Sequence, residues 1–308
     1  MGDSTDVFAI DDGAATDPAF ISNFPVDMCL FKNKDITASN AIISRLTQGK
    51  YLLTDSTAAE AGGTAYQFDF MDGCITSSGG LSSSYIGYMW RRQKGFFDVV
   101  AYTGDSVSAQ TIDHNLGAVP EMMWVKRRNA ISAAGWITYH KDSLNSTTSS
   151  PLDAFILLNS DGTTNDFPSA WGSSLTDSTF TVAAADDINL TGGTYIAYLF
   201  ATLAGISKVG SYTGNGTSQT INAGFTTGAK FIIVKRTDST GDWFMWDSVR
   251  GIVAGNDPHL SLNTTAAEVT TDDSIDPDAS GFIVNQNATT NINVSSAAYI
   301  YYCISEGV

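Results

Sequence analysis

The sequence predicts an all-β protein of three tandem antiparallel β-sandwich modules, jelly-roll-like in topology, with an extended N-terminal arm. Three observations predict it: internal repetition, one strand that recurs at module spacing, and short β-rich runs bounded by turn residues. The clearest repeat pairs Tyr102–Arg127 with Tyr212–Arg236. Both copies open with Tyr-Thr-Gly, continue with Gln-Thr-Ile and end in an apolar run followed by Lys-Arg. A repeat unit of about a hundred residues is a whole domain, so the copies are modules and not solenoid turns.

A third, shorter and more diverged copy lies between Phe24 and Arg92. Its last strand contains the pair Tyr-Ile at Tyr85, and the same pair recurs at Tyr195 and Tyr299. These positions are 110 and 104 residues apart, which is close to the length of one module. The recurrence predicts three modules instead of two.

Two charged positions recur among the copies. Lys32, Lys126 and Lys235 each end an apolar run, and we expect such cations to leave a strand end into water. Glu60 and Glu268 end the matching strings Tyr51–Glu60 and His259–Glu268, and a turn or helix-end role is expected for them.

The domain boundaries predicted from these copies are an arm over residues 1–23 and modules over 24–96, 97–204 and 205–308. The arm lacks clear periodicity and could order against a neighbouring subunit. An edge strand on the first module is the alternative. The two joins between modules contain apolar residues, unlike a flexible Gly/Ser tether. The modules are therefore expected in fixed relation, with Phe96, Phe97, Leu203 and Ile206 buried near the contacts.

Strands are predicted where β-branched and aromatic residues cluster between Gly, Asn, Asp and Ser. In the middle module these are Glu121–Lys126, Trp136–Tyr139, Phe155–Leu158, Phe180–Val182 and Tyr195–Ala201. In the third they are Phe231–Lys235, Trp243–Trp246, Leu260–Leu262, Phe282–Val284 and Tyr299–Ile304. One or two helical turns are expected within residues 37–48.

Composition restricts the class of partner. The chain has 32 acidic and 16 basic residues, for a net charge of -16. Such a surface repels phosphate, so nucleic acid is not an expected partner. No apolar run is long enough to insert into a membrane, and the acidic N-terminus does not resemble a secretory signal. Cys29, Cys74 and Cys303 are expected as buried thiols of a protein folded in a reducing cytoplasm, with a Cys29–Cys74 disulfide as the alternative.

Two sets of residues are candidates for binding. Exposed tryptophans could stack on sugar rings, although core packing is the commoner fate of this residue. The candidates are Trp136, Trp171, Trp243 and Trp246. The acidic stretch with Asp272, Asp273, Asp276 and Asp278 could coordinate Ca²⁺, which prefers several oxygen ligands, or could be a solvated turn. No other cofactor is expected.

Catalytic motifs do not occur in the sequence. The three histidines lack zinc-ligand spacing, and there is no Gly-x-Ser-x-Gly elbow or phosphate-binding glycine loop. We therefore expect a protein without enzymatic activity.

Several strings resemble a repeated module of virion proteins from marine tailed bacteriophages, often labelled tail-fibre or structural proteins. They are Lys32-Asn33, Tyr51–Glu60, His259–Glu268, Ser84–Trp90 and Asp238–Gly251. The resemblance covers about residues 24–305 and implies a virion component, made in the host cytoplasm, whose partners are other virion proteins. It also implies a homo-oligomer, with a trimer favoured.

The expected function is that of a tail-associated host-recognition protein, of tail-fibre type, which would bind a cell-surface glycan or protein. The alternative is a capsid head-decoration or other virion-surface structural protein. A glycan-degrading tail spike is the third possibility. The middle module departs most from the others and inserts Phe167–Trp171, a segment that could make a specialised contact.

Overall fold

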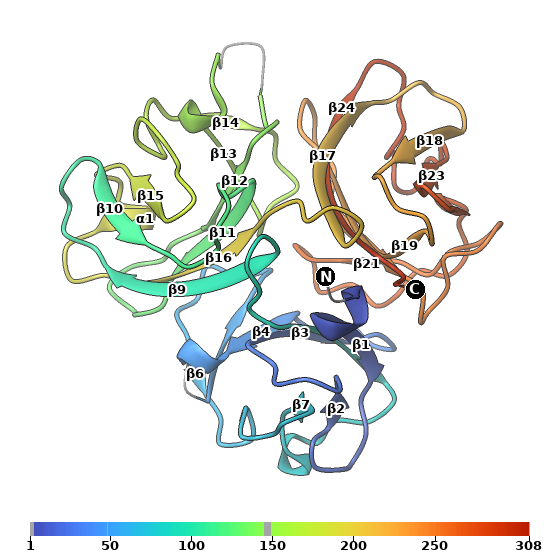
Figure 1. Ribbon diagram of the computed structural model, residues 1–308, viewed down its shortest axis with the longest axis horizontal. Coiled ribbons are helices and arrows are strands. Elements are labelled where there is room, and N and C mark those ends of the chain that lie inside the picture. Colours follow the sequence, from blue (N-terminus) through green and yellow to red (C-terminus); the bar gives the residue numbers. More distant parts are fainter. Residues whose placement is uncertain (1–2, 48, 145–148, 308) are drawn as a thin grey trace.

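The computed structural model describes residues 3–47, 49–144 and 149–307. It is an all-β structure in which three large antiparallel sheets surround a common centre (Figure 1). Each large sheet belongs to one module and is covered on its outer side by a small sheet or its loops. Among the described residues, no helix is long and apolar enough to cross a membrane.

The first module has a six-stranded sheet in the order β1-β8-β3-β4-β5-β6 and a small sheet β2-β7. Its strands are β1 (Phe8–Asp12), β2 (Phe20–Ile21), β3 (Met28–Asn33), β4 (Ala41–Ser44), β5 (Lys50–Leu53), β6 (Ala61–Gly62), β7 (Gly73–Cys74) and β8 (Tyr85–Trp90). Short 3₁₀ turns are η1 (Ser4–Asp6), η2 (Arg45–Thr47) and η3 (Ser77–Gly79). Of the one or two helical turns expected within residues 37–48, one is present as the 3₁₀ turn η2, residues 41–44 form β4 instead, and residue 48 lies outside the described residues.

The second module has a six-stranded sheet in the order β14-β13-β12-β11-β16-β9 and a small sheet β10-β15. Its strands are β9 (Phe97–Thr103), β10 (Gln110–Asp113), β11 (Met122–Arg127), β12 (Trp136–His140), β13 (Ala154–Leu157), β14 (Asn165–Asp166), β15 (Thr179–Val182) and β16 (Thr194–Phe200). It also contains η4 (Pro151–Asp153) and one helical turn, α1 (Asp186–Asn189).

The third module has a five-stranded sheet in the order β17-β24-β19-β20-β21 and a small sheet β18-β23-β22. Its strands are β17 (Ser207–Thr213), β18 (Gln219–Asn222), β19 (Ala229–Arg236), β20 (Trp243–Asp247), β21 (Leu260–Ser261), β22 (Ile275–Asp278), β23 (Gly281–Val284) and β24 (Ala298–Ser305). The ten strands predicted in the second and third modules are all present, with ends that differ by up to two residues.

The three modules have the same strand register. Lys32 of β3 lies opposite Ile86 of β8, as Lys126 lies opposite Ile196 and Lys235 opposite Ile300. The alignment of the sequence copies is therefore also an alignment in space, and the repeated module is confirmed.

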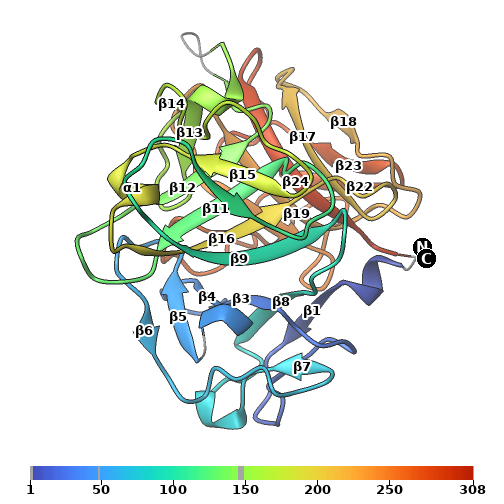
Figure 2. The same cartoon turned by 60° about the vertical axis from the view of Figure 1, so that its left-hand side comes forward.

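The N-terminal segment is part of the first sheet. β1 pairs along its whole length with β8, from Phe8 opposite Trp90 to Asp12 opposite Ile86. This is the edge-strand alternative for residues 1–23, of which the structure describes residues 3–23, and η1 precedes the strand under an Asp3 cap. The two described ends lie against each other, since a Cβ on Gly307 would meet the Asp3 carboxylate (Figure 2).

Each module has its own apolar core between its large sheet and the segments outside it. The first contains Phe20, Phe31 and Cys29, the second Trp171 and Phe180, and the third contains residues such as Phe282. All three cysteines are free and buried, so the disulfide alternative is wrong. These cores make each module an unequal sandwich of a larger and a smaller layer.

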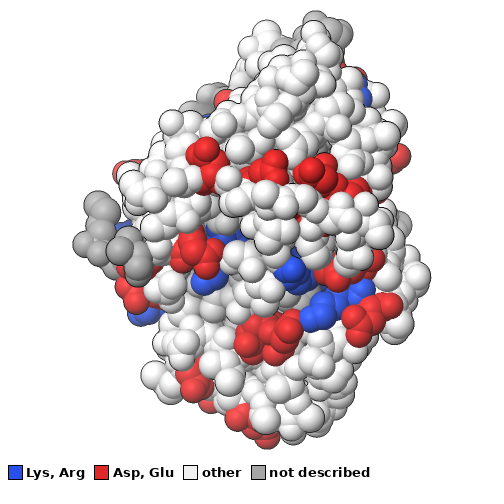
Figure 3. All heavy atoms as spheres, turned by 90° about the vertical axis from the view of Figure 1, so that its right-hand side faces the viewer, with Lys and Arg blue, Asp and Glu red and all other residues white. Residues whose placement is uncertain are grey.

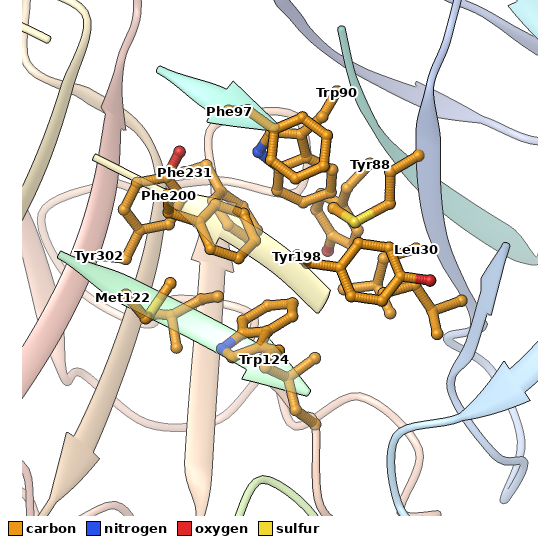
Figure 4. Packing of buried hydrophobic residues seen from close by; sticks show 14 of the residues in the cluster. Leu30, Tyr88, Trp90, Phe97, Met122, Trp124, Tyr198, Phe200, Phe231 and Tyr302 are labelled. Carbon is orange, nitrogen blue, oxygen red and sulfur yellow. The ribbon is translucent and has the colours of Figure 1, made fainter. Parts of the chain in front are cut away.

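The opposite faces of the large sheets share a fourth, central core. Aromatic side chains from different modules meet there: Trp90 and Phe231 have ring centroids 5.6 Å apart, and Phe200 and Tyr302 are 5.1 Å apart (Figure 4). The joins contribute Phe96, Phe97 and Ile206, with Leu203 packed against them, as expected from their apolar character. Because the three modules bury one another's inner faces, they form one packed body.

Candidate binding site

The tryptophans predicted to bind ligand are all buried. Trp136 and Trp243 face the central core, and each donates a hydrogen bond from its indole nitrogen into the neighbouring module, to the carbonyl oxygens of Leu53 (2.8 Å) and Leu157 (2.9 Å). A ring enclosed in this way cannot stack on a sugar. Both residues therefore act in module contact, which corrects the prediction of a ligand role.

Trp171 and Trp246 pack inside their own modules. The Trp171 indole nitrogen donates to the Ala154 carbonyl oxygen at 2.8 Å, and its ring meets Tyr139 edge-on. Trp246 packs against both Phe244 and His259, which also contact each other. The inserted segment thus contributes Trp171 to a core, and the sugar-stacking prediction is wrong for this pair too.

The four aspartates predicted to bind calcium do not converge. Asp272 is buried and its carboxylate lies 3.1 Å from Nδ1 of His259. Asp273 and Asp276 both accept hydrogen bonds from the Asn285 amide. Asp278 accepts from the backbone and hydroxyl of Ser280, in the turn between β22 and β23. Among described residues no group of three or more acidic, histidine or cysteine side chains is arranged to hold a metal ion. The four carboxylates serve local structure instead.

The three recurring lysines point inward, not into water. Lys32, Lys126 and Lys235 are at most 1% exposed, and burial lowers the pKa of each to about 8. Each ammonium donates to a carbonyl oxygen of the following loop in its own module, at Ala38, Ala134 and Gly241 respectively. The expectation of solvated strand ends was wrong because it ignored the neighbouring module.

Two of these lysines also bridge modules. Nζ of Lys235 donates to the carbonyl oxygens of Asp161 and Gly162 in the second module, at 3.0 and 2.8 Å. Nζ of Lys32 donates to Thr264 of the third module at 3.4 Å. These hydrogen bonds satisfy the buried ammonium groups and the carbonyls of the neighbouring module where water is excluded, so the two modules fit only as a pair.

The contacts between modules repeat in one direction and close into a ring. The third module reaches the second through Trp243, the second reaches the first through Trp136, and the first reaches the third through Asn40. Asn40 takes the place of the tryptophan and donates to the carbonyl oxygens of Ser261, Leu262 and Thr264. A head-to-tail contact that returns to its start after three units is a closed cyclic arrangement, here within one chain.

The recurring glutamates belong to the same ring. The backbone amide of Glu60 donates to Arg128 of the second module, and that of Glu268 donates to Lys34 of the first, both at 2.8 Å. The Glu60 carboxylate also pairs with the Arg128 side chain. Their recurrence therefore marks a module contact and not only a turn.

An open groove lies at the far edge of the first sheet. It has a volume of about 760 Å³ and runs between the β5 and β6 edge and the loop that follows β6. It is lined by Arg45, Gly49, Lys50, Gly62, Gly63, Thr64, Tyr66, Gln67, Phe68 and Asp69. Its size falls within the range of about 300–1,000 Å³ that small-molecule sites occupy.

Tyr66 is the central aromatic residue of this groove. Its ring is held edge-on by Tyr51 at 5.2 Å and lies 5.8 Å from Phe31. A Cβ on Gly63 would lie 2.6 Å from the Tyr66 ring, so glycine is needed for the ring to take this position. Partial burial raises the pKa of Tyr66, so its hydroxyl is protonated at neutral pH.

The cations of the groove are already paired. The Arg45 guanidinium lies 5.7 Å over the Phe68 ring and 3.5 Å from the Asp27 carboxylate. Lys50 lies 2.9 Å from the carboxylate of Glu60. The carboxylate of Asp69 is exposed and makes no hydrogen bond or ion pair with the described residues. The charges of the groove and its first neighbours therefore nearly cancel.

A smaller, apolar slot of about 310 Å³ lies in the second module. Its walls include Ile137, Phe155 and the inserted Phe167, and the acidic residues Asp186 and Asp187 line its rim. The inserted segment thus forms part of this slot, and the sequences of the other two modules lack that segment. On the face shown in Figure 3 most of the surface is neither acidic nor basic, and the few basic side chains lie beside acidic ones.

The fold and the groove define a class: a three-module all-β protein whose modules share a core and whose first module carries an open, polar, aromatic-lined groove. Residues 91–307 match a domain of unknown function, DUF7483, and the chain therefore belongs to this family. The matched region begins directly after β8 and contains the second and third modules. No curated protein and no solved structure matches the chain.

Proposed function

We propose that this chain is a non-enzymatic structural protein of a tailed-phage virion, associated with the tail, that takes part in recognising the host surface. The proposal rests on the resemblance of its repeated strings to virion modules of marine tailed phages. The observation that carries the recognition role is the groove of the first module. It is open to solvent, and its Tyr66 ring, although packed against Phe31 and Tyr51, is only partly buried, while the Asp69 carboxylate beside it is exposed.

The rigidity of the body supports this role. Three modules share a central core and are joined by repeated backbone hydrogen bonds. A binding surface on such a body keeps its geometry when the particle collides with a cell, and preorganisation of this kind favours affinity. The partners would be other virion proteins and a host glycan or surface protein.

The head-decoration alternative depended in part on an N-terminal arm that docks onto a neighbour. Residues 8–12 are instead paired with β8 of the same chain, and Phe8 packs against Phe231 in the central core. This strand is therefore occupied within the chain, which favours the tail role over the decoration role. The homotrimer stays a prediction, and the three modules of one chain already supply a threefold arrangement.

The experiment that tests the proposal is labelling of intact virions with an antibody against this chain, viewed by electron microscopy. Label at the tail tip or fibres is the expected result. Label over the head would replace the tail role by the decoration role. Particles without label, from a lysate in which the antibody detects the chain, would refute the virion proposal.

A further inference from the structure

The groove of the first module combines three chemical features in one concavity. Tyr66 offers a partly exposed ring, and the Asp69 carboxylate, the Gln67 amide oxygen and the Thr64 hydroxyl offer acceptors and a donor; the Gln67 amide nitrogen itself donates to the Thr64 carbonyl oxygen at 2.9 Å. The backbone at Gly62 carries no side chain, so a ligand can approach it closely. A ligand that fits must itself have an apolar face and a rim of hydroxyl or amide groups.

The charges of the groove further restrict the class of ligand that it can bind. Arg45 and Lys50 are engaged by Asp27 and Glu60, and Glu60 is also held by Arg128 at 2.8 Å. A strongly anionic ligand would have to compete with these carboxylates for the two cations. A strongly cationic ligand would find only Asp69 without such a partner among the described residues. Both cations of the groove are paired and a single carboxylate remains, so the groove offers too little unpaired charge to hold a strongly charged ligand, and the best complement is a neutral molecule.

We propose that this groove binds a short neutral saccharide, with one sugar ring stacked on Tyr66 and its hydroxyls bonded to Asp69, Gln67 and Thr64. A pyranose has weakly polarised C–H groups on one face and hydroxyls around its edge, and the negative face of an aromatic ring attracts such C–H groups. The proposal deepens the proposed function, on which it rests for the source of the saccharide: a host-surface glycan.

Gly62 allows a sharp test of this site. It lies in β6, and a Cβ built on it meets no atom within 4 Å, so a larger side chain can enter the groove without displacing the fold. Gly62→Trp should therefore fill the groove while the thermal midpoint stays near that of the wild type. Tyr66→Leu removes the ring, and Asp69→Asn removes the acceptor charge.

The measurement uses the purified full chain and defined probes: maltotriose, mannotriose, chitotriose and lactose as neutral saccharides, with sialyllactose and a glucosamine trimer as charged comparators. Saturation-transfer NMR and calorimetry are expected to detect at least one neutral probe. Gly62→Trp and Tyr66→Leu should each weaken it by about tenfold or more, which corresponds to about 1.4 kcal/mol. The matched control Asp113→Asn changes an exposed carboxylate in β10 of the second module and should leave binding unchanged.

Three outcomes would overturn the inference: no neutral probe binds, only a charged probe binds, or Gly62→Trp binds as tightly as the wild type. The proposed function is judged separately by virion labelling. If the chain labels the tail but a phage that carries Gly62→Trp adsorbs to host cells as well as the wild type does, the saccharide site in the groove is refuted and the proposed function stands. If the purified chain binds a neutral saccharide but the antibody labels the head, the saccharide site stands and the tail role is refuted.

Discussion

The indole nitrogen of Trp243 donates a hydrogen bond to the carbonyl oxygen of Leu157, 2.9 Å away in the neighbouring module. Trp136 makes the equivalent bond to Leu53 at 2.8 Å. At the third contact between modules, Asn40 donates instead to three carbonyl oxygens of β21 and the loop after it. One position in the repeated unit thus joins all three modules, with two different side chains.

This relationship predicts the effect of Trp243→Phe. The aromatic ring stays in the central core, but the Leu157 carbonyl loses its donor in a buried seam. Leaving such a group unpaired costs about 1–3 kcal/mol of unfolding free energy. Urea denaturation followed by far-UV circular dichroism measures it.

Trp246→Phe is the matched control for that variant. The Trp246 indole nitrogen is buried and makes no hydrogen bond with the described residues, so its removal leaves no acceptor unpaired. We expect a smaller loss, or a gain in stability. Equal losses in both variants would contradict an energetic role for the bond between modules.

A second prediction concerns Lys235→Met. The substitution removes the donor to Asp161, Gly162 and Gly241, and although it also removes a buried charge, we expect a net loss of about 2 kcal/mol at pH 7. Lys208→Met is the control: Lys208 is half-buried in β17 and makes no ion pair with the described residues, so its loss should be within about 0.5 kcal/mol.

The pH dependence of this variant is a further test of the same lysine. Burial lowers the pKa of Lys235 from 10.5 to about 8, so between these values the unfolded chain binds more protons than the folded one. Stability contributed by this group therefore rises with pH from about 8 to 10.5. The difference in unfolding free energy between wild type and Lys235→Met should grow over that range. A constant difference would show that the lysine titrates normally in the folded chain.

Much of this architecture could be predicted from sequence because the repeat is legible in the strands themselves. The Tyr-Ile pairs and the Lys that ends each apolar run predict the number of modules and align their strands. The shared core had a signal too: runs such as Met122–Val125 and Phe231–Val234 are apolar without alternation, which is typical of strands buried on both faces. Each sheet has one face on its own small layer and the other on the centre.

The site could not be predicted in the same way. Exposure of Trp136 and Trp243 depends on the position of another module, and recurrence alone does not distinguish a contact from a ligand site. The groove is built by Gly62 at the end of β6 and by Gly63 and Tyr66 in the loop after it, a part of the first module without a recognised counterpart in the other copies. The rule that aromatic rings bind sugars pointed to tryptophan, but the structure uses all six tryptophans for packing.

Acid sensitivity gives a third prediction. Burial lowers the pKa of His140 from 6.5 to about 4, while Nδ1 accepts a hydrogen bond from the Asp142 amide. Between those pH values the unfolded chain binds the extra proton, so this group's contribution to stability is lost as pH falls from 6.5 to 4, by up to about 1.4 kcal/mol per pH unit.

His140→Asn keeps an acceptor for the Asp142 amide and removes the titration. Its unfolding free energy should fall less steeply than that of the wild type between pH 6.5 and 4, measured in urea at several pH values. Asp257 works in the opposite direction in both proteins, because burial raises its pKa to about 6. Parallel curves for the two proteins would show that His140 is protonated in the fold.

The closed ring leads to the fourth prediction, on a fragment of residues 91–308. It contains the two modules that match DUF7483 but lacks the first module, which covers the inner faces of the other two. Removing it exposes Phe231, Tyr302 and Leu262 and breaks the hydrogen bonds of Trp136 with Leu53 and of Leu262 with Asn40. An apolar surface of this kind is not stable in water as a monomer.

We expect the fragment to associate or to bind a hydrophobic dye, and to lose the single cooperative unfolding transition that a shared core predicts for the full chain. Light scattering after gel filtration and dye fluorescence measure both properties, with the full chain as control. Addition of residues 3–90 in trans should restore a compact species if the ring contacts suffice for recognition. A fragment that stays monomeric and unfolds cooperatively would show that the second and third modules need no partner, and that the central core adds stability without being required for the fold.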